Sequence, residues 1–183
     1  MFKKKKLNKI IVSENSFNDN DPYKIIGSNI SVVNVLREEG TDIEEIHDDA
    51  MLSYYVDFYL AQYNNGDFSQ FVWNSKWDEE LIENIAIGLE KMGAEKHLQF
   101  FEEQCAKVEN LSEEELDAFL DGEYFGENPT RDLLNNDAFF DIDEKLIELN
   151  SKWLKNHPDL KVHSIDDMFA AIEKFLGRKI EKY

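Results

Sequence analysis

The apolar residues of this chain recur at intervals of three and four, the spacing of one face of an α-helix. The pattern begins with Ile30, Val33 and Leu36, and it predicts a longer helix over residues 43–64 that Gly66 ends. The next helix is predicted over 78–92, because a third apolar set has the same period: Leu81, Ile82, Ile85, Leu89 and Met92.

Capping residues predict where the remaining helices start. Asp78 opens the helix over 78–92, and another helix should run over 94–109. Ser112 followed by Glu115 is a capping box that starts a short helix. The last three starts are Thr130 for 131–139, Asp141 or Asp143 for a helix reaching Leu154, and Ser164 for the final helix to Leu176.

These elements predict an all-α fold. Residues 1–27 form a polar, partly basic N-terminal segment, with a short extended piece at Lys9–Ser13, and residues 28–183 form a single acidic helical domain. No stretch alternates as a strand or hairpin would. Aromatic residues decorate more than one side of the helix over 43–64, so we expect it at the centre of a compact multi-helix bundle: Tyr54, Tyr55, Phe58, Tyr59 and Tyr63.

Charge is distributed unevenly along the chain. Residues 38–150 hold 31 of the 39 acidic side chains but 6 of the 20 Lys and Arg, a net of −25 within a total of −19. A folded region this acidic repels itself, which destabilises the compact state. A basic partner is therefore the interpretation that we favour over solubility or a halophilic host.

Composition also bears on location and on cysteine chemistry. The Lys-rich start is followed by too short an apolar run for a signal peptide, and no run is long enough to span a membrane, so we expect a cytoplasmic protein. Cys105 is the only cysteine, which excludes an internal disulfide and a thiolate zinc cluster. We interpret it as a buried, inert thiol.

The sequence predicts no enzyme, no cofactor and no metal site. Glu44 and His47 have the spacing of half a di-iron motif, but no second Glu-x-x-His occurs. His97, which lies beside Phe100 and Phe101, is interpreted as a histidine at the edge of the core. No nucleophile elbow or phosphate-binding glycine loop is present.

Amide side chains surround the end of the long helix, in the string from Gln62 to Asn74. They can satisfy free backbone groups where one helix ends and the next begins. Phe68 and Phe71 would then fill the core from the second helix. The alternative is a ligand-binding or catalytic pocket built on four amides: Gln62, Asn65, Gln70 and Asn74.

The same string resembles the signature of the acidic DNA-mimic family called DMP-nineteen. The residues that carry the resemblance are Gln62, Asn64, Asn65, Gly66, Phe68, Gln70, Phe71 and Asn74. Segments at 88–97 and 153–158 are also similar, so the likeness covers roughly residues 42–165. Where the family has a second glycine after Asn-Asn-Gly, this chain has Asp67.

The resemblance implies a helical protein that forms homodimers and imitates DNA. Such a protein occupies the basic DNA-binding face of a helix-turn-helix regulator and keeps it from its operator, and it does not bind nucleic acid itself. The shared string would be the structural core of the family, and the mimicking surface would lie elsewhere.

Carboxylates four residues apart share one face of a helix, so acidic rows can reach a charge density of the order of one DNA strand. Three clusters are predicted to imitate phosphates. The first contains Glu113, Glu114, Asp117, Asp121, Glu123 and Glu127. The second contains Asp42, Glu44, Glu45, Asp48 and Asp49, and the third Asp141, Asp143 and Glu144.

Two other functions are compatible with part of these observations. An antitoxin or immunity protein that inhibits a basic nuclease would need the same electrostatics. A small enzyme or ligand-binding domain would use the amide-rich corner at 62–74, and its acidity would be incidental.

Overall fold

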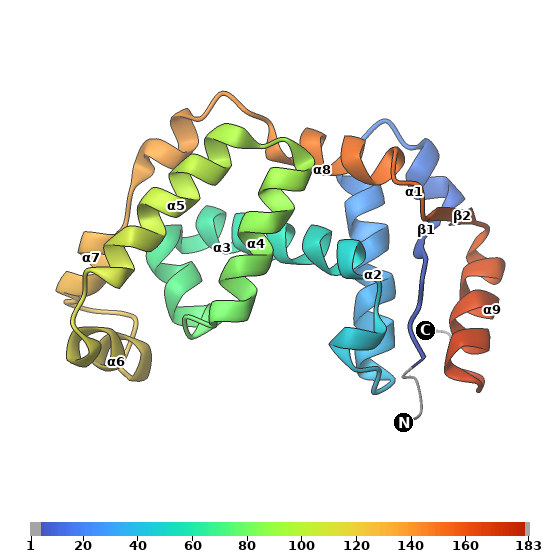
Figure 1. Cartoon of the computed structure of the whole chain (residues 1–183), viewed down its shortest axis with the longest axis horizontal. Helices are drawn as coiled ribbons and strands as arrows, with labels where there is room; N and C mark the ends of the chain where they lie inside the picture. Colours follow the sequence, from blue (N-terminus) through green and yellow to red (C-terminus); the bar gives the residue numbers. More distant parts are fainter. Residues whose placement is uncertain (1–4, 182–183) are drawn as a thin grey trace. The chain divides into compact units, whose positions relative to one another are not determined.

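The computed structural model describes residues 5–181, which divide into two compact units. Unit 1 combines the residues up to 54 with those from 147 onward, and unit 2 comprises residues 55–146. Helices dominate both units (Figure 1), so the predicted helical fold is confirmed, and the structure adds one small sheet. None of the described helices is long and apolar enough to cross a lipid bilayer.

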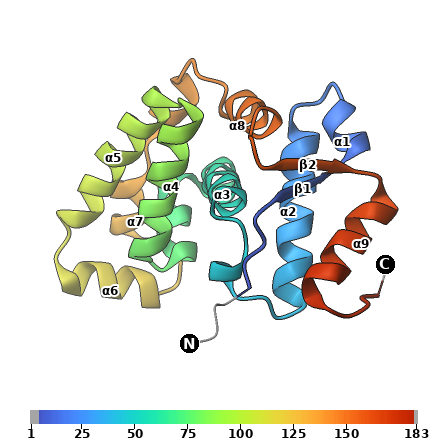
Figure 2. The ribbon, with the colours of Figure 1, turned by 45° about the vertical axis from the view of Figure 1, so that its right-hand side comes forward.

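Unit 1 is built around two parallel strands, β1 (Ile10–Ser13) and β2 (Leu160–His163), with Ile10 opposite Leu160. All of β1 is buried, and it packs against helices α2 (Tyr23–Glu38) and α9 (Ile165–Leu176), between which it lies in Figure 1. Figure 2 shows the same strands after a turn of the view. Strand β1 is the extended piece predicted at Lys9–Ser13. Strand β2 was not predicted, because its pairing partner is about 150 residues away and four residues are too few to establish an alternation.

The other helices of unit 1 also differ in detail from the prediction. A short helix α1 (Glu14–Asn18) follows β1, so the polar N-terminal segment contributes β1, α1 and the start of α2. Helix α8 (Leu146–Lys155) begins later than the predicted Asp141 or Asp143. Ser164 caps α9 as predicted, its hydroxyl accepting the Asp167 N–H at 3.2 Å.

Two histidines and two aspartates form a reciprocal clasp in unit 1. The Nδ1 atoms of His47 and His157 each accept the backbone N–H of the aspartate two residues later, Asp49 and Asp159, at 3.1 Å. Each ring proton therefore lies on Nε2. His157 Nε2 donates to Asp49 at 2.8 Å, and His47 Nε2 lies 3.5 Å from Asp159. The clasp joins the start of helix α3 to the segment after α8.

Helix α3 (Asp48–Ser75) is longer than the helix predicted over 43–64. A single 3-10 turn, η1 (Ile43–Glu45), precedes it, so the helix starts at Asp48. Helical structure resumes after a kink at Gly66 and Asp67, the two residues whose backbone angles are not helical. Gly66 therefore marks a break between two helical pieces, which agrees with the helix end predicted at this residue.

Unit 2 contains α3 from Tyr55 onward, together with four further α-helices. Helices α4 (Glu79–Met92) and α5 (Glu95–Glu109) form an adjacent pair, reversed at Gly93, which has φ 72° (Figures 1 and 2). Helix α6 (Glu113–Asp121) follows the C-terminal end of α5, and α7 (Pro129–Leu134) packs against both. The predicted caps Asp78 and Ser112 are confirmed.

The helix predicted over 131–139 is wrong. Asn128, not Thr130, caps α7, which ends at Leu134, and a separate 3-10 helix η2 follows (Asp137–Asp141). Asn136 explains the break: its backbone is extended, at φ −158°, and its side chain accepts the Ala138 N–H and so starts η2. A local side-chain hydrogen bond here competes successfully with a continuous helix.

Aromatic rings fill the core of unit 2. Tyr59, Tyr63, Phe68, Phe71 and Phe101 are each at most 1% exposed. The Tyr63 ring stacks on Phe139 at 3.9 Å between centroids, and its hydroxyl donates to the Asn136 carbonyl at 2.7 Å. The Tyr59 hydroxyl is also buried, yet it has no hydrogen-bond partner among residues 5–181. Burial raises the pKa of both tyrosines.

Asp49→Ala is expected to lower the free energy of unfolding by about 1.5–3 kcal/mol, because it leaves the His157 N–H without its charged acceptor. Asp48→Ala is the matched control. Asp48 pairs with Lys6 at 2.6 Å on the surface, with 76% of its side chain exposed, so its loss should cost less than about 1 kcal/mol. Urea unfolding of the two variants measures both values, and equal losses would contradict the clasp.

Tyr59→Phe and Tyr63→Phe should change stability in opposite directions. Removing the unsatisfied Tyr59 hydroxyl relieves its desolvation and should raise the free energy of unfolding by about 1 kcal/mol. Removing the Tyr63 hydroxyl breaks a hydrogen bond and should lower it by about 1 kcal/mol. Thermal unfolding of both variants tests the assignment, and a destabilised Tyr59→Phe would show that its hydroxyl has a partner.

Candidate functional site

The negative charge of the protein is concentrated in unit 2. Residues 55–146 contain 23 acidic and 6 basic side chains, a net of −17. The remaining 16 acidic and 14 basic residues belong to unit 1, which has a net charge of −2. Any surface that recognises a basic partner by charge is therefore to be sought on unit 2.

Helix α6 carries the densest acidic row. Its capping box is formed: the Ser112 hydroxyl accepts the Glu115 N–H at 3.2 Å, and the Glu115 carboxylate accepts the Ser112 N–H at 2.9 Å. These bonds with Ser112 lower the pKa of Glu115, so that carboxylate is charged at neutral pH. Phe119 is buried and fixes the helix to the unit, which leaves the acidic face in solvent.

The predicted residues of this first cluster are all exposed: Glu113, Glu114, Asp117, Asp121, Glu123 and Glu127. Across residues 5–181, no basic side chain forms an ion pair with any of them. Helix α6 has five carboxylates over roughly 12 Å of axis, counting Glu115, about one per 3 Å. One DNA strand has a phosphate per ~3.4 Å, so the two densities are comparable.

A groove runs between α6 and α7. Its volume is about 590 Å³, and three carboxylates line it, those of Glu114, Glu115 and Glu127. Asn128 lines the α7 side of the groove. It caps α7, and its side chain accepts the Arg131 N–H at 3.0 Å. The groove is polar, open and acidic, so it can receive the ammonium or guanidinium end of a basic side chain.

The second predicted cluster lies in unit 1, and several of its members have partners within the unit. The Glu45 carboxylate accepts the Asp42 N–H at 3.3 Å. Asp48 pairs with Lys6, and Asp49 belongs to the histidine clasp. Glu44 is exposed on the 3-10 turn before α3. Asp49 is half-buried and accepts the His157 N–H, so it stabilises the fold. The second cluster is therefore not one open row of exposed carboxylates.

The third predicted cluster is at the opposite end of α5 from α6. Asp143 pairs with Lys96, which lowers the pKa of that carboxyl. Glu144 accepts the backbone N–H of Lys96 at 2.9 Å and of His97 at 3.2 Å, and so caps α5. Only Asp141 of this cluster is exposed without such a role. Helix α5 is 15 residues long, so roughly 20 Å separates this cluster from α6.

Sequence reasoning missed an acidic stripe on α5. Glu95, Glu102, Glu103 and Glu109 are all exposed on this helix, between the third cluster and α6. Their signal was present in the sequence, since residues 95, 102 and 109 are seven apart and lie on one face. Cys105 lies on the buried face of α5, so its predicted burial is confirmed. Burial, and then Glu109 and Glu102, raise the pKa of its thiol to about 12, which disfavours the reactive thiolate.

The amide string at 62–74 forms a helix–helix corner. Gln70 and Asn74 both donate their side-chain N–H groups to the Gln62 side-chain oxygen, at 3.0 Å for Gln70. Asn65 donates to the Ala61 carbonyl at 2.8 Å. Phe68 and Phe71 are fully buried, as predicted. The exposed Asn64 is the other amide of the string.

The corner depends on two special backbone positions. A Cβ on Gly66 would lie 3.0 Å from the Gln70 Cβ and closer to its side-chain oxygen, so a larger residue there would force the Gln70 side chain to move. Asp67 has φ 65° and ψ −170°, a region that is nearly exclusive to glycine. The glycine that the resemblance implies at this position would adopt this conformation without strain. Asp67 compensates with its carboxylate, which accepts the N–H of Phe68 at 2.6 Å and of Asn136 at 3.0 Å.

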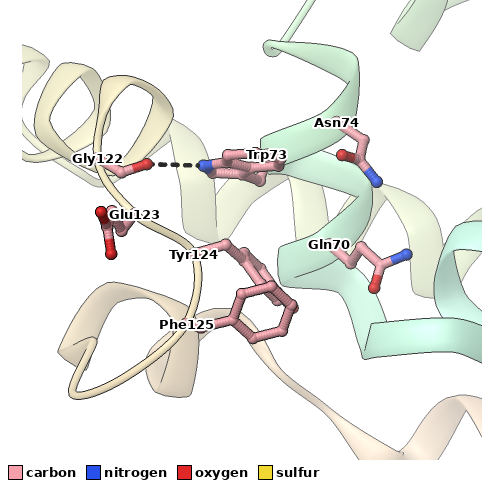
Figure 3. Close-up of a pocket in the computed structure, with 7 residues that line it drawn as sticks. All are labelled: Gln70, Trp73, Asn74, Gly122, Glu123, Tyr124 and Phe125. Atoms are coloured by element: carbon pink, nitrogen blue, oxygen red, sulfur yellow. Dashed lines mark hydrogen bonds between the residues drawn. The ribbon is translucent and has the colours of Figure 1, made fainter.

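Beside the corner lies a second cavity, of about 460 Å³, shown in Figure 3. Helix α3 contributes Gln70, Trp73 and Asn74, and the loop after α6 contributes Gly122, Glu123, Tyr124 and Phe125. Two of the four amides predicted for a pocket thus line it, whereas Gln62 and Asn65 do not. The cavity is open at one side and has aromatic walls.

These features define a class: an acidic, mostly helical protein in which an Asn-Asn-Gly corner orders the aromatic core. The chain matches the family described as DMP19-like protein over residues 44–157, which is more than half of its length. The protein therefore belongs to the DMP19-like protein family, and the resemblance seen in the sequence is confirmed. Comparison with curated proteins gave no match, and comparison with solved structures gave none.

Asp67→Ala and Asp67→Gly separate the two contributions of this residue. Both lose the hydrogen bonds to Phe68 and Asn136, so Asp67→Ala should lower the free energy of unfolding by about 2–4 kcal/mol. Glycine adopts the observed backbone angles without strain, so Asp67→Gly should lose about 1–2 kcal/mol less. Chemical unfolding measures the difference, and equal losses would argue against backbone strain at this position.

Proposed function

We propose that this protein is a DNA mimic that binds the basic DNA-binding face of a helix-turn-helix regulator and blocks its access to operator DNA. Membership of the family supports this function, and one observation carries it for this chain. That observation is the exposed carboxylate row of α6, which no basic side chain of residues 5–181 neutralises. The α6 carboxylates would take the positions of phosphates and accept hydrogen bonds from Arg and Lys.

The physical reasoning favours α6 over the other clusters. An exposed charge that already has a partner must give that partner up before it binds another, which reduces its net contribution. Asp48, Asp49 and Asp143 are in that position, whereas Asp117 and Asp121 are not. The α5 stripe extends the acidic surface away from α6 at a lower charge density.

The predicted homodimer and the regulator itself remain predictions. An inhibitor of a basic nuclease would use the same acidic surface, so the identity of the bound protein decides between the two functions. A DNA mimic must compete with duplex DNA for its partner, and this competition is the property to test.

The test compares two variants of equal net charge. The first neutralises α6 with Glu113→Gln, Glu114→Gln, Asp117→Asn and Asp121→Asn. The control neutralises four exposed carboxylates of α4, with Glu79→Gln, Glu80→Gln, Glu83→Gln and Glu90→Gln. Each set removes two acidic residues from the first turn of its helix, so losses of helix stability are matched.

Proteins captured from the host lysate on the immobilised chain are eluted with duplex DNA and identified, and their operator complexes are titrated with each variant in gel-shift assays. The wild-type chain should displace the DNA, with an affinity that falls steeply with salt. The α6 variant should bind roughly 10- to 100-fold more weakly, whereas the α4 variant should stay close to wild type. A regulator–DNA complex that the wild-type chain leaves intact would overturn the proposal.

A further inference from the structure

We propose that the cavity beside α6 is a binding site for an arginine side chain of the basic partner. This inference rests on the proposed function, because it assigns one specific contact on the same acidic surface. The cavity is lined by three aromatic residues, Trp73, Tyr124 and Phe125, by Gln70 and Asn74 of α3, and by Gly122 and Glu123 of the loop after α6 (Figure 3).

Phe125 is the most exposed large apolar residue of unit 2, at 84%. Within residues 5–181, its only ring contact is with Tyr124, at 5.4 Å between centroids. The following residue, Gly126, has φ 95°, a turn conformation that holds Phe125 out of the core. An exposed ring beside a cavity gains free energy only when another molecule covers it, and such rings are typical anchors of protein interfaces.

The other two aromatic walls are held in place. The Trp73 indole N–H donates to the Gly122 carbonyl at 3.2 Å (Figure 3), and the Tyr124 hydroxyl donates to the Gly66 carbonyl at 2.9 Å. The Trp73 and Tyr124 rings lie 5.7 Å apart. A cavity with fixed walls loses little conformational entropy when it is filled.

The polar groups beside the cavity include oxygen acceptors for a ligand. Gln70 and Asn74 each donate one side-chain N–H to Gln62, which orients both amides. The carbonyl oxygen of Asn74 is thereby left to accept from a ligand. In the view of Figure 3, the Asn74 oxygen points toward Trp73 and its nitrogen away. The Glu123 carboxylate points away from the rings in Figure 3, and it forms no ion pair within the described residues, so the edge of the cavity is acidic. The acidic edge and the adjacent carboxylates of α6 therefore favour a ligand that is positively charged and has hydrogen-bond donors.

Arginine meets these requirements better than lysine. Its planar guanidinium has five donors and stacks on aromatic faces, whereas lysine presents a compact ammonium. The protein already shows that this region attracts cations: the Lys76 ammonium lies 4.5 Å from the centre of the Trp73 ring. Phe125 and Tyr124 have no such internal cation among residues 5–181 and would stack on the incoming guanidinium.

The experiment uses two defined probes, a hexa-arginine and a hexa-lysine peptide of equal charge, titrated calorimetrically into the full chain at several salt concentrations. Phe125→Leu keeps apolar bulk and removes the ring, Phe125→Tyr restores a ring, and Leu133→Ala is a control at a 58% exposed apolar residue of α7. Both positions are on the surface, so folding of the three variants should be unaffected.

The wild-type chain should bind hexa-arginine more tightly than hexa-lysine. Phe125→Leu should weaken hexa-arginine about 3- to 10-fold and change hexa-lysine less than about 2-fold, because only the stacking contact is lost. Phe125→Tyr and Leu133→Ala should keep the wild-type preference. A Phe125→Leu variant that retains the full preference, or that loses both peptides equally, overturns the arginine site alone. If neither peptide binds the wild-type chain, the acidic surface itself, and with it the proposed function, is overturned.

Discussion

The packing of aromatic rings in unit 2 is the interaction on which the rest of the structure depends. Unit 2 has a net charge of −17, so its carboxylates repel one another in the folded state. Like charges one helical turn apart cost a few tenths of a kcal/mol per pair. Burying Tyr59, Tyr63, Phe68, Phe71 and Phe101 contributes roughly 1.5–3 kcal/mol for each ring, so burial outweighs the repulsion. The acidic face can persist because the core beneath it is apolar and closely packed.

The corner at Gly66 and Asp67 connects this core to the candidate binding surface. Its kink lets one helix supply both Tyr63 and Phe68 to the core, from either side of the break. The Gly66 carbonyl also holds Tyr124, which follows the acidic helix α6. The family motif is thus structural, and it also positions the loop that carries Phe125. Charge on α6 would bring a basic partner close, and the adjacent aromatic cavity would add a contact that salt does not screen.

Local signals in the sequence predicted the helical elements well where a side chain caps its own helix. Asp78, Ser112 and Ser164 do so in the structure, and the starts of α4, α6 and α9 follow from them. Predictions failed where a distant contact or a second local bond decided the conformation. Strand β2 needs β1, and Asn136 divides a predicted helix because it bonds to Asp67, to Gln104 and to the Ala138 N–H. Asp67 and Gln104 are 69 and 32 residues away in the chain.

The sequence by itself determined the helical class, the acidity, the family and the buried aromatic residues, because helical periodicity, side-chain charge and capping are properties of neighbouring residues. Only the tertiary structure decided which carboxylates remain available. Asp49 and Asp117 look alike in the sequence, but His157 approaches one of them and no basic side chain of residues 5–181 pairs with the other. The aromatic cavity likewise exists only because folding brings residues 70–74 against 122–125. Electrostatic and stacking contacts depend on distances in space, and the order of residues along the chain does not give those distances.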